Sequence, residues 1–116
     1  MPSPATAASP ARVTIRLDLP AGRVGPGKVA LLEAIDREGS ISAAARHLGM
    51  SYPRAWGLVS QLDTILGEEV VARAPGGRKG GGAALTEAGR RLIARYRAVE
   101  AAAQSAAGPA PEAGGA

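Results

Sequence analysis

The stretch Ile41–Leu62, ISAAARHLGMSYPRAWGLVSQL, decides the fold of this chain. It contains two helical patterns separated by a short turn. Ala45 and Gly49 stand where two crossing helices need a small residue and where their turn needs a glycine. The positions that such a helix pair buries are all apolar: Ala44, Leu48, Met50, Ala55 and Leu58. Their agreement predicts a helix-turn-helix, and the alternative is an ordinary helical hairpin that binds nothing.

Patterns on both sides of this stretch extend it to a winged helix-turn-helix. Apolar residues alternate with polar ones over 13–19, as in a half-buried strand, up to Pro20 and the glycines of 22–27. Gly39 ends the helix that follows, and Ser51 is a natural cap for the helix after the turn. The expected elements are a strand over 13–19, a helix over 28–38, a helix begun by Ser40 or Ser42, a helix from Ser51 to Leu66, strands starting at Val70 and over 83–85, and a last helix from Thr86 and Glu87.

The predicted fold class is mainly α with a small β component: a strand, three helices, a β-hairpin wing and a long C-terminal helix. In this chain of 116 residues, the folded unit is expected over residues 12–107 as a single domain. Residues 1–11 and 108–116 are expected to be disordered tails. Small residues and proline dominate there, and they cannot bury enough apolar surface to offset the entropy of ordering.

Composition and charge exclude most enzyme chemistry. The chain has no cysteine and one histidine, His47, so a disulfide, a cysteine nucleophile and a metal site built on these ligands are not expected. We find no pair of groups with catalytic spacing and expect no enzyme. A net charge of +4 favours an anionic partner, and nucleic acid is the first choice for a small basic domain. No membrane span or secretory signal is recognisable, which favours a cytoplasmic protein.

A glycine-rich run over 76–82 follows the predicted strand at Val70. It is not a phosphate-binding loop, because Lys79 is followed by three glycines rather than by Ser or Thr at the start of a helix. The run is better explained as the tip of a hairpin wing. Arg78 and Lys79 are therefore expected to lie along a DNA backbone, and the alternative is a solvated hairpin.

The second helix of the pair is expected to present its N-terminal, outward side chains to base edges in the major groove. Arg54 can bond guanine with both ends of its guanidinium, and Gln61 can read adenine similarly. The alternative for Arg54 is a solvated charge. Trp56 is expected to pack in a core or interface, and His47 to be a solvated surface group. The residues of the helix-turn-helix expected to contact DNA are Ser42, Ser51, Tyr52, Pro53, Arg54, Gly57, Ser60 and Gln61.

A dimer is expected because a single chain of this composition has a small core. The apolar stripe of the last helix, together with part of the first, could be buried against a second copy. Two-fold symmetry then predicts a pseudo-palindromic DNA site with half-sites about 10 base pairs, or a multiple of that, apart. The residues expected at this interface are Leu31, Leu32, Leu92, Tyr96 and Val99.

Four segments resemble the N-terminal DNA-binding domain of ModE-type, molybdate-responsive regulators: GSIS at 39–42, SYPRAW at 51–56, GGRKGGGA at 76–83 and LTEAG at 85–89. The resemblance covers residues 12–102. LysR-type regulators share the winged helix and the last of these segments but are more distant, since they normally lack the Tyr-x-x-Ala-Trp pattern and the glycine-rich wing. Pro53 stands where a basic residue is expected in the ModE-type family.

The resemblance implies a homodimeric transcriptional regulator of double-stranded DNA. Full-length members of that family continue into domains that bind oxyanions such as molybdate. This chain ends in a Gly/Pro tail, so molybdate is implied by the resemblance alone and no cofactor is expected. Two other interpretations remain open: a non-specific architectural DNA-binding protein, and a dimerisation module that pairs with a longer relative and alters its activity.

Overall fold

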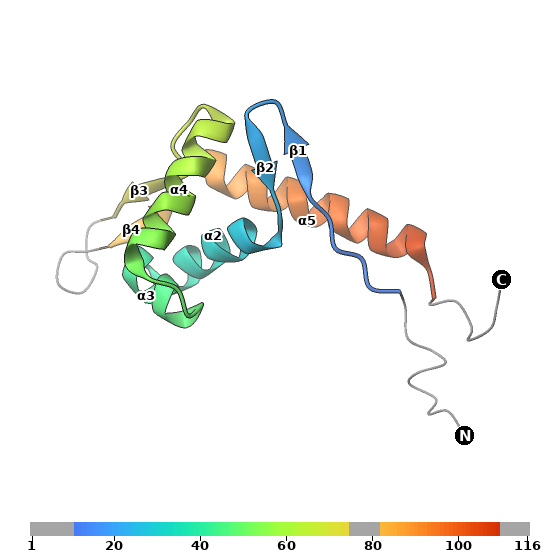
Figure 1. The fold of residues 1–116 in the computed structure, drawn as a ribbon, viewed down its shortest axis with the longest axis horizontal. Coiled ribbons are helices and arrows are strands. Elements are labelled where there is room, and N and C mark those ends of the chain that lie inside the picture. Colours follow the sequence, from blue (N-terminus) through green and yellow to red (C-terminus); the bar gives the residue numbers. More distant parts are fainter. Residues whose placement is uncertain (1–10, 75–81, 110–116) are drawn as a thin grey trace, which may run out of the picture.

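The computed structural model describes residues 11–74 and 82–109. Within these residues, two antiparallel hairpins accompany four helices, which confirms the predicted fold class (Figure 1). Most of the two expected tails lies outside the described residues. The elements in chain order are β1 (Leu17–Leu19), β2 (Gly22–Val24), α2 (Pro26–Glu38), α3 (Ile41–His47), α4 (Tyr52–Leu66), β3 (Val71–Arg73), β4 (Ala83–Leu85) and α5 (Glu87–Ala107).

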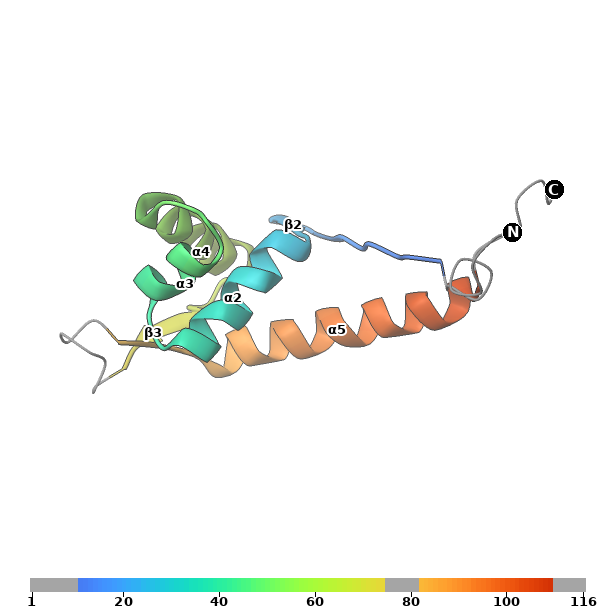
Figure 2. The same ribbon diagram turned by 90° about the horizontal axis from the view of Figure 1, so that it is seen from below.

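The helices form layers, with α2 between α5 on one side and the α3–α4 pair on the other (Figure 2). The β3–β4 hairpin extends from one end of this arrangement, and α5 extends beyond the opposite end. The core side chains that α2 supplies, Val29, Leu31, Leu32 and Ile35, are completely buried. No helix within residues 11–74 and 82–109 is long and apolar enough to cross a membrane.

The N-terminal region differs from its sequence-based prediction. Only Leu17–Leu19 of the alternating segment is a strand, and it pairs with Gly22–Val24 instead of remaining alone. The region predicted as turn residues therefore supplies the second strand of a tight hairpin. A lone strand would leave its backbone groups unpaired, whereas the hairpin satisfies them locally. The next helix starts at Pro26, two residues earlier than predicted, because proline is well suited to a first helical turn.

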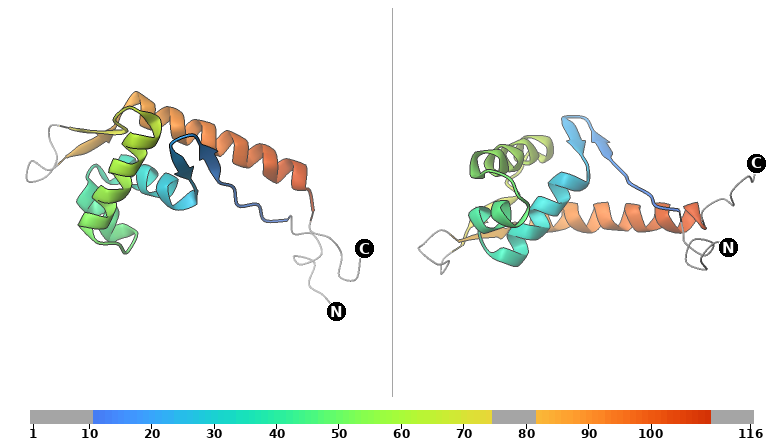
Figure 3. Two further views of the ribbon diagram at one scale, coloured as in Figure 1. Left: turned by 45° about the horizontal axis from the view of Figure 1, so that its top comes forward. Right: turned by 60° about the horizontal axis from the view of Figure 1, so that its bottom comes forward.

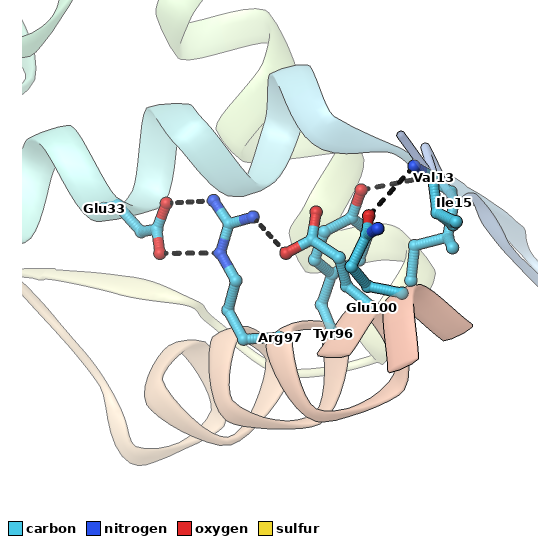
Figure 4. Close-up of polar contacts among 7 residues, drawn as sticks. Val13, Ile15, Glu33, Tyr96, Arg97 and Glu100 are labelled. Atoms are coloured by element: carbon cyan, nitrogen blue, oxygen red, sulfur yellow. Dashed lines mark hydrogen bonds and ion pairs between the residues drawn. The ribbon is translucent and has the colours of Figure 1, made fainter. Parts of the chain in front are cut away.

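The remainder of the expected strand runs alongside α5 and is held by it. The phenolic hydroxyl of Tyr96 donates to the carbonyl oxygen of Ile15 at 2.9 Å, and the amide of Val13 donates to Gln104 Oε1 at 3.0 Å (Figure 4). The amide of Ala11 donates to the carbonyl of Gly108 at 3.0 Å. Ordered contacts therefore reach one residue beyond each end of the expected domain.

Four of the five residues expected at a dimer interface lie in the core of the single chain. Leu31, Leu32 and Tyr96 are 0% exposed and Leu92 is 5% exposed, whereas Val99 is 40% exposed. The reason is that α5 packs along α2, so the apolar stripes of these two helices cover each other within one chain. A helical stripe shows that a face is buried but not whether its partner is the same chain or a second copy.

An ion-pair cluster joins α2 to α5 beside this core. The guanidinium of Arg97 donates twice to the Glu33 carboxylate, at 2.6 and 3.0 Å, and once to Glu100 at 2.7 Å (Figure 4). These hydrogen bonds raise the pKa of Arg97 further above its usual value. The same guanidinium lies over the ring of Tyr96, 5.5 Å from its centroid. Arg97 therefore fixes α5 against α2.

The base of the β3–β4 hairpin is tied to the start of α5. The Thr86 hydroxyl donates to the carbonyl of Glu69 at 2.6 Å and accepts from the amide of Gly89 at 3.2 Å, which caps the helix. A side chain at Gly89 would meet the carbonyl oxygen of Val70 at under 3.0 Å. Only a glycine at position 89 therefore lets α5 approach the backbone of Val70, the residue before β3, so closely.

Candidate nucleic-acid interface

The turn between α3 and α4 has the geometry expected of a helix-turn-helix. Ala44 and Ala55 are 0% exposed and Ala45 is 2% exposed, so the two helices cross on small side chains. Gly49 has φ +69°, a left-handed conformation that glycine adopts without strain. Leu48, Met50 and Leu58, which were predicted to be buried, are partly buried and pack against the core.

Serine side chains start both helices. Ser40 Oγ accepts from the amide of Ala43 at 3.0 Å, so Ser40 rather than Ser42 caps α3. Ser51 Oγ accepts from the amide of Arg54 at 3.2 Å and caps α4. Each cap satisfies one backbone N–H of a first turn, and the remaining N–H groups there stay available to an anion.

One exposed surface, which we call the recognition face, carries eight of the ten residues predicted to contact DNA. It combines one hydroxyl on α3 with the solvent-facing side of α4 and its cap. Its members are Ser42, Ser51, Tyr52, Pro53, Arg54, Gly57, Ser60 and Gln61. The other two predicted residues, Arg78 and Lys79, lie outside the described residues.

Gly57 lies in the interior of α4, where glycine is unfavourable. No described heavy atom beyond its local neighbours comes within 4 Å of the position that a side chain would take. Packing within the described chain therefore does not explain this glycine. A glycine at this position would let an external surface approach the backbone of α4 closely.

Trp56 is the main departure from the predicted site. It is 43% exposed rather than packed, and its ring meets that of Tyr52, which is 50% exposed, edge to face at 6.2 Å. The expectation of a core position within the chain is wrong for this residue. The sequence spacing could have indicated this ring contact, because Trp56 lies four residues after Tyr52 and hence on the same side of α4.

A hollow of about 530 Å³ lies between this aromatic pair and the β3–β4 hairpin. Ser42 and Arg73 also line it, as do the acidic residues Asp63 and Glu69. Arg73, at the end of β3, was not among the predicted DNA contacts, which for the wing included only its tip. Nor was Arg46, whose guanidinium donates to Ser42 Oγ at 3.1 Å. The spacing of four residues between Ser42 and Arg46 could have indicated that contact.

A winged helix-turn-helix with an exposed, polar second helix is the architecture of bacterial regulators that bind DNA. The family model described as "Bacterial regulatory helix-turn-helix protein, lysR family" matches residues 27–90. This chain belongs to that family. The match spans the elements from α2 to the first turn of α5.

The helix-turn-helix region is similar in sequence to ModE-type proteins among the curated relatives. This similarity confirms the resemblance drawn from the sequence. The chain is 54% identical over 85 residues to the molybdenum-pterin-binding protein MopB of Rhodobacter capsulatus, covering 73% of this chain and 32% of that protein. It is 42% identical over 71 residues to the DNA-binding transcriptional dual regulator ModE of Escherichia coli K12, covering 61% of this chain and 27% of that protein. The chain thus spans about a third of the length of its curated relatives. By name, these two relatives are a molybdenum-pterin-binding protein and a DNA-binding transcriptional regulator.

Among solved structures, the chain is similar to the DNA-binding domain of CbnR in complex with DNA. The TM-score is 0.55 at 26% identity, and the similarity covers 69% of this chain and 87% of that one. Both the fold and a modest part of the sequence are therefore shared with a domain solved on DNA.

Proposed function

We propose that this chain is the double-stranded-DNA-binding part of a transcriptional regulator and that it recognises a specific sequence. The observation that carries this proposal is the recognition face, an exposed polar surface on the second helix of a helix-turn-helix. The N-terminal half of α4 enters the major groove, and the β3–β4 hairpin lies along the backbone. The similarity to CbnR on DNA and the names of the ModE-type relatives support the same function.

Individual residues of the recognition face have distinct chemistry toward DNA. Arg54 can donate two hydrogen bonds to guanine, and Gln61 can pair with adenine. The hydroxyls of Ser42 and Tyr52 suit phosphate oxygens, which position the domain without reading its sequence. Together these groups supply both base contacts and backbone contacts from one rigid pair of helices.

We also propose that the chain acts as a homodimer through α5, by a surface different from the one predicted from sequence. Val99, Ala102 and Ala106 are exposed and lie three and four residues apart, so they share one face of α5. This face could pack against the same face of a second copy about a two-fold axis. Half-sites about 10 base pairs apart, or a multiple of this, remain the expected DNA arrangement.

The proposal is tested by incubating the purified chain with fragmented genomic DNA at about 150 mM salt and sequencing the retained fragments. A few fragments sharing a two-fold motif would support a specific dimeric regulator. Even retention of all fragments would indicate an architectural protein instead. Retention of none would overturn DNA binding, and a longer relative that co-purifies would then support the dimerisation module. A parallel incubation with molybdate tests whether the oxyanion changes retention.

Arg54→Ala is expected to weaken binding to the selected site by about 1–3 kcal/mol and to relax the preference at one base pair, because two hydrogen bonds to a base are lost. Affinities for the site and its single-base variants measure this. Arg37→Ala is a matched control, since it removes the same charge from the last turn of α2, outside the recognition face. If Arg54→Ala weakened the affinity for every DNA sequence equally, Arg54 would contact a backbone phosphate instead of a base.

Gly57→Ala is expected to have opposite effects on stability and on binding. Open space around Gly57 allows the new methyl group, so the free energy of unfolding should rise by about 0.5–1 kcal/mol. Affinity for the selected site should fall, because the methyl group stands between α4 and the DNA. Thermal unfolding and a binding titration on the same preparation check both. Unchanged affinity would show that DNA does not approach at Gly57.

A further inference from the structure

A second hollow, of about 460 Å³, lies on the opposite side of α4 from the β3–β4 hairpin, and we call it the hairpin hollow. One wall is the β1–β2 turn with Arg23 and Lys28, and the other is the C-terminal half of α4. The residues lining it are Ala21, Gly22, Arg23, Lys28, Ser60, Gln61, Thr64 and Ile65. Two of these, Ser60 and Gln61, belong to the recognition face, so the hollow continues that surface.

The β1–β2 hairpin is held against α4 by close packing. A side chain at Gly22 would come within 2.6 Å of Ile65 Cγ1, so only glycine permits this approach without displacing Ile65. Gly22 also pairs with Leu19 across the two-residue turn. The position of Arg23, next in sequence to Gly22, is therefore fixed relative to α4 by the fold.

The charge of the hairpin hollow is positive. The Arg23 side chain is 70% exposed, and its ion pair with Asp18 is long, at 3.8 Å. Lys28 Nζ donates to the backbone carbonyl oxygen of Arg23 at 2.7 Å, which holds the ammonium group against the hairpin. Among the residues that the structure describes, no carboxylate lines this hollow. Two cations beside hydroxyl and amide groups form a surface suited to a phosphate.

The hairpin stands on the DNA-facing side of the molecule. Two views show the β1–β2 hairpin rising on the same side as α4 and away from α5 (Figures 2 and 3). The β3–β4 hairpin and the β1–β2 hairpin thus flank α4 from different sides. A duplex whose major groove receives α4 brings one backbone past each flank.

We propose that the hairpin hollow binds a backbone phosphate of the DNA that α4 reads, with Arg23 and Lys28 as its ligands. The β1–β2 hairpin then acts as a second wing, placed before the helix-turn-helix in sequence. This inference rests on the proposed function and adds to it a contact on the flank opposite the β3–β4 hairpin.

The test measures binding of the full chain to the selected duplex over a series of salt concentrations. Loss of one phosphate contact makes the slope of log affinity against log salt less steep by about 0.9. Arg23→Ala is expected to show this change, with equal weakening on the selected site and on an unrelated duplex. Arg37→Ala, which removes the same charge from the last turn of α2, should leave the slope unchanged. Thermal unfolding confirms that each variant is folded.

A second arm locates the phosphate. Duplexes shortened stepwise from their ends should lose affinity for the unaltered chain at the step that removes the contacted phosphate, and Arg23→Ala should not respond to that step. An unchanged salt slope together with the same length dependence as the unaltered chain would overturn the second wing and leave DNA binding standing. Absence of binding by the unaltered chain to every duplex would overturn the proposed function itself.

Discussion

Replacing Gly89 by alanine should lower the free energy of unfolding by about 3 kcal/mol. The new methyl group would lie under 3.0 Å from the carbonyl oxygen of Val70, and 3.5 Å from Leu85 Cβ. The obstructing atom belongs to the backbone, so it cannot move aside as the end of a side chain could. Either α5 must shift away from the base of the β3–β4 hairpin or that hairpin must distort, and both changes give up packing in the core.

Chemical denaturation of Gly89→Ala and Gly57→Ala, followed by circular dichroism, measures this effect. The matched comparison is informative because both glycines are helical and differ mainly in their surroundings. The Gly57 variant should be at least as stable as the unaltered chain. Equal stability of the two variants would contradict the close approach of α5 to Val70.

Tyr96→Ala should cost about 3–5 kcal/mol of unfolding free energy, the range for truncating a large buried ring. Tyr96 is completely buried, and its hydroxyl holds the N-terminal segment through the carbonyl of Ile15. Tyr96→Phe keeps the ring and removes only this hydrogen bond, so it should cost about 1 kcal/mol. Denaturation curves of the three proteins separate the two contributions. A loss of dimerisation with unchanged stability of the monomer would contradict the position of Tyr96 in the core.

The same tyrosine predicts how stability depends on alkaline pH. Burial raises the pKa of Tyr96 above its usual value of 10.0, and the nearby charge of Glu100 raises it further, whereas Arg97 lowers it. The folded state therefore binds the phenolic proton more tightly than the unfolded state. Its contribution to stability is complete below pH 10 and is lost as the pH rises through the raised pKa. Tyr96→Phe should lack this loss, which denaturation curves at a series of alkaline pH values would show.

Local sequence signals predicted the helix-turn-helix well because its determinants are short in range. The helix cap, the small residue at the helix crossing and the glycine in the turn all lie close together in sequence, within the same helical hairpin. The recognition face followed from the same periodicity, since the side opposite the buried Ala55, Val59 and Leu62 must face solvent. Trp56 was the exception, because the general preference of tryptophan for buried positions outweighed its place on that side.

Pairings between distant segments could not be predicted in this way. The alternation over 13–19 indicated an extended backbone but not its partners, which are β2 for one half and α5 for the other. The apolar stripes of α2 and α5 indicated burial but not the choice between the same chain and a second copy. Ile15 and Tyr96 are 81 residues apart in sequence, and no local pattern encodes such a contact.

By itself, the sequence determined the class of fold, the turn at Gly49, the cap at Ser51 and the polar side of the recognition helix. These depend on backbone preferences and on the 3.6-residue period of a helix, which act over a few residues. Only the tertiary structure decided that Leu31, Leu32 and Tyr96 complete the core of one chain. It also brought Arg23 and Gln61 to the lining of one hollow. These arrangements arise from packing between segments far apart in the chain, where shape and close approach, as at Gly22 and Gly89, select one partner among many apolar surfaces.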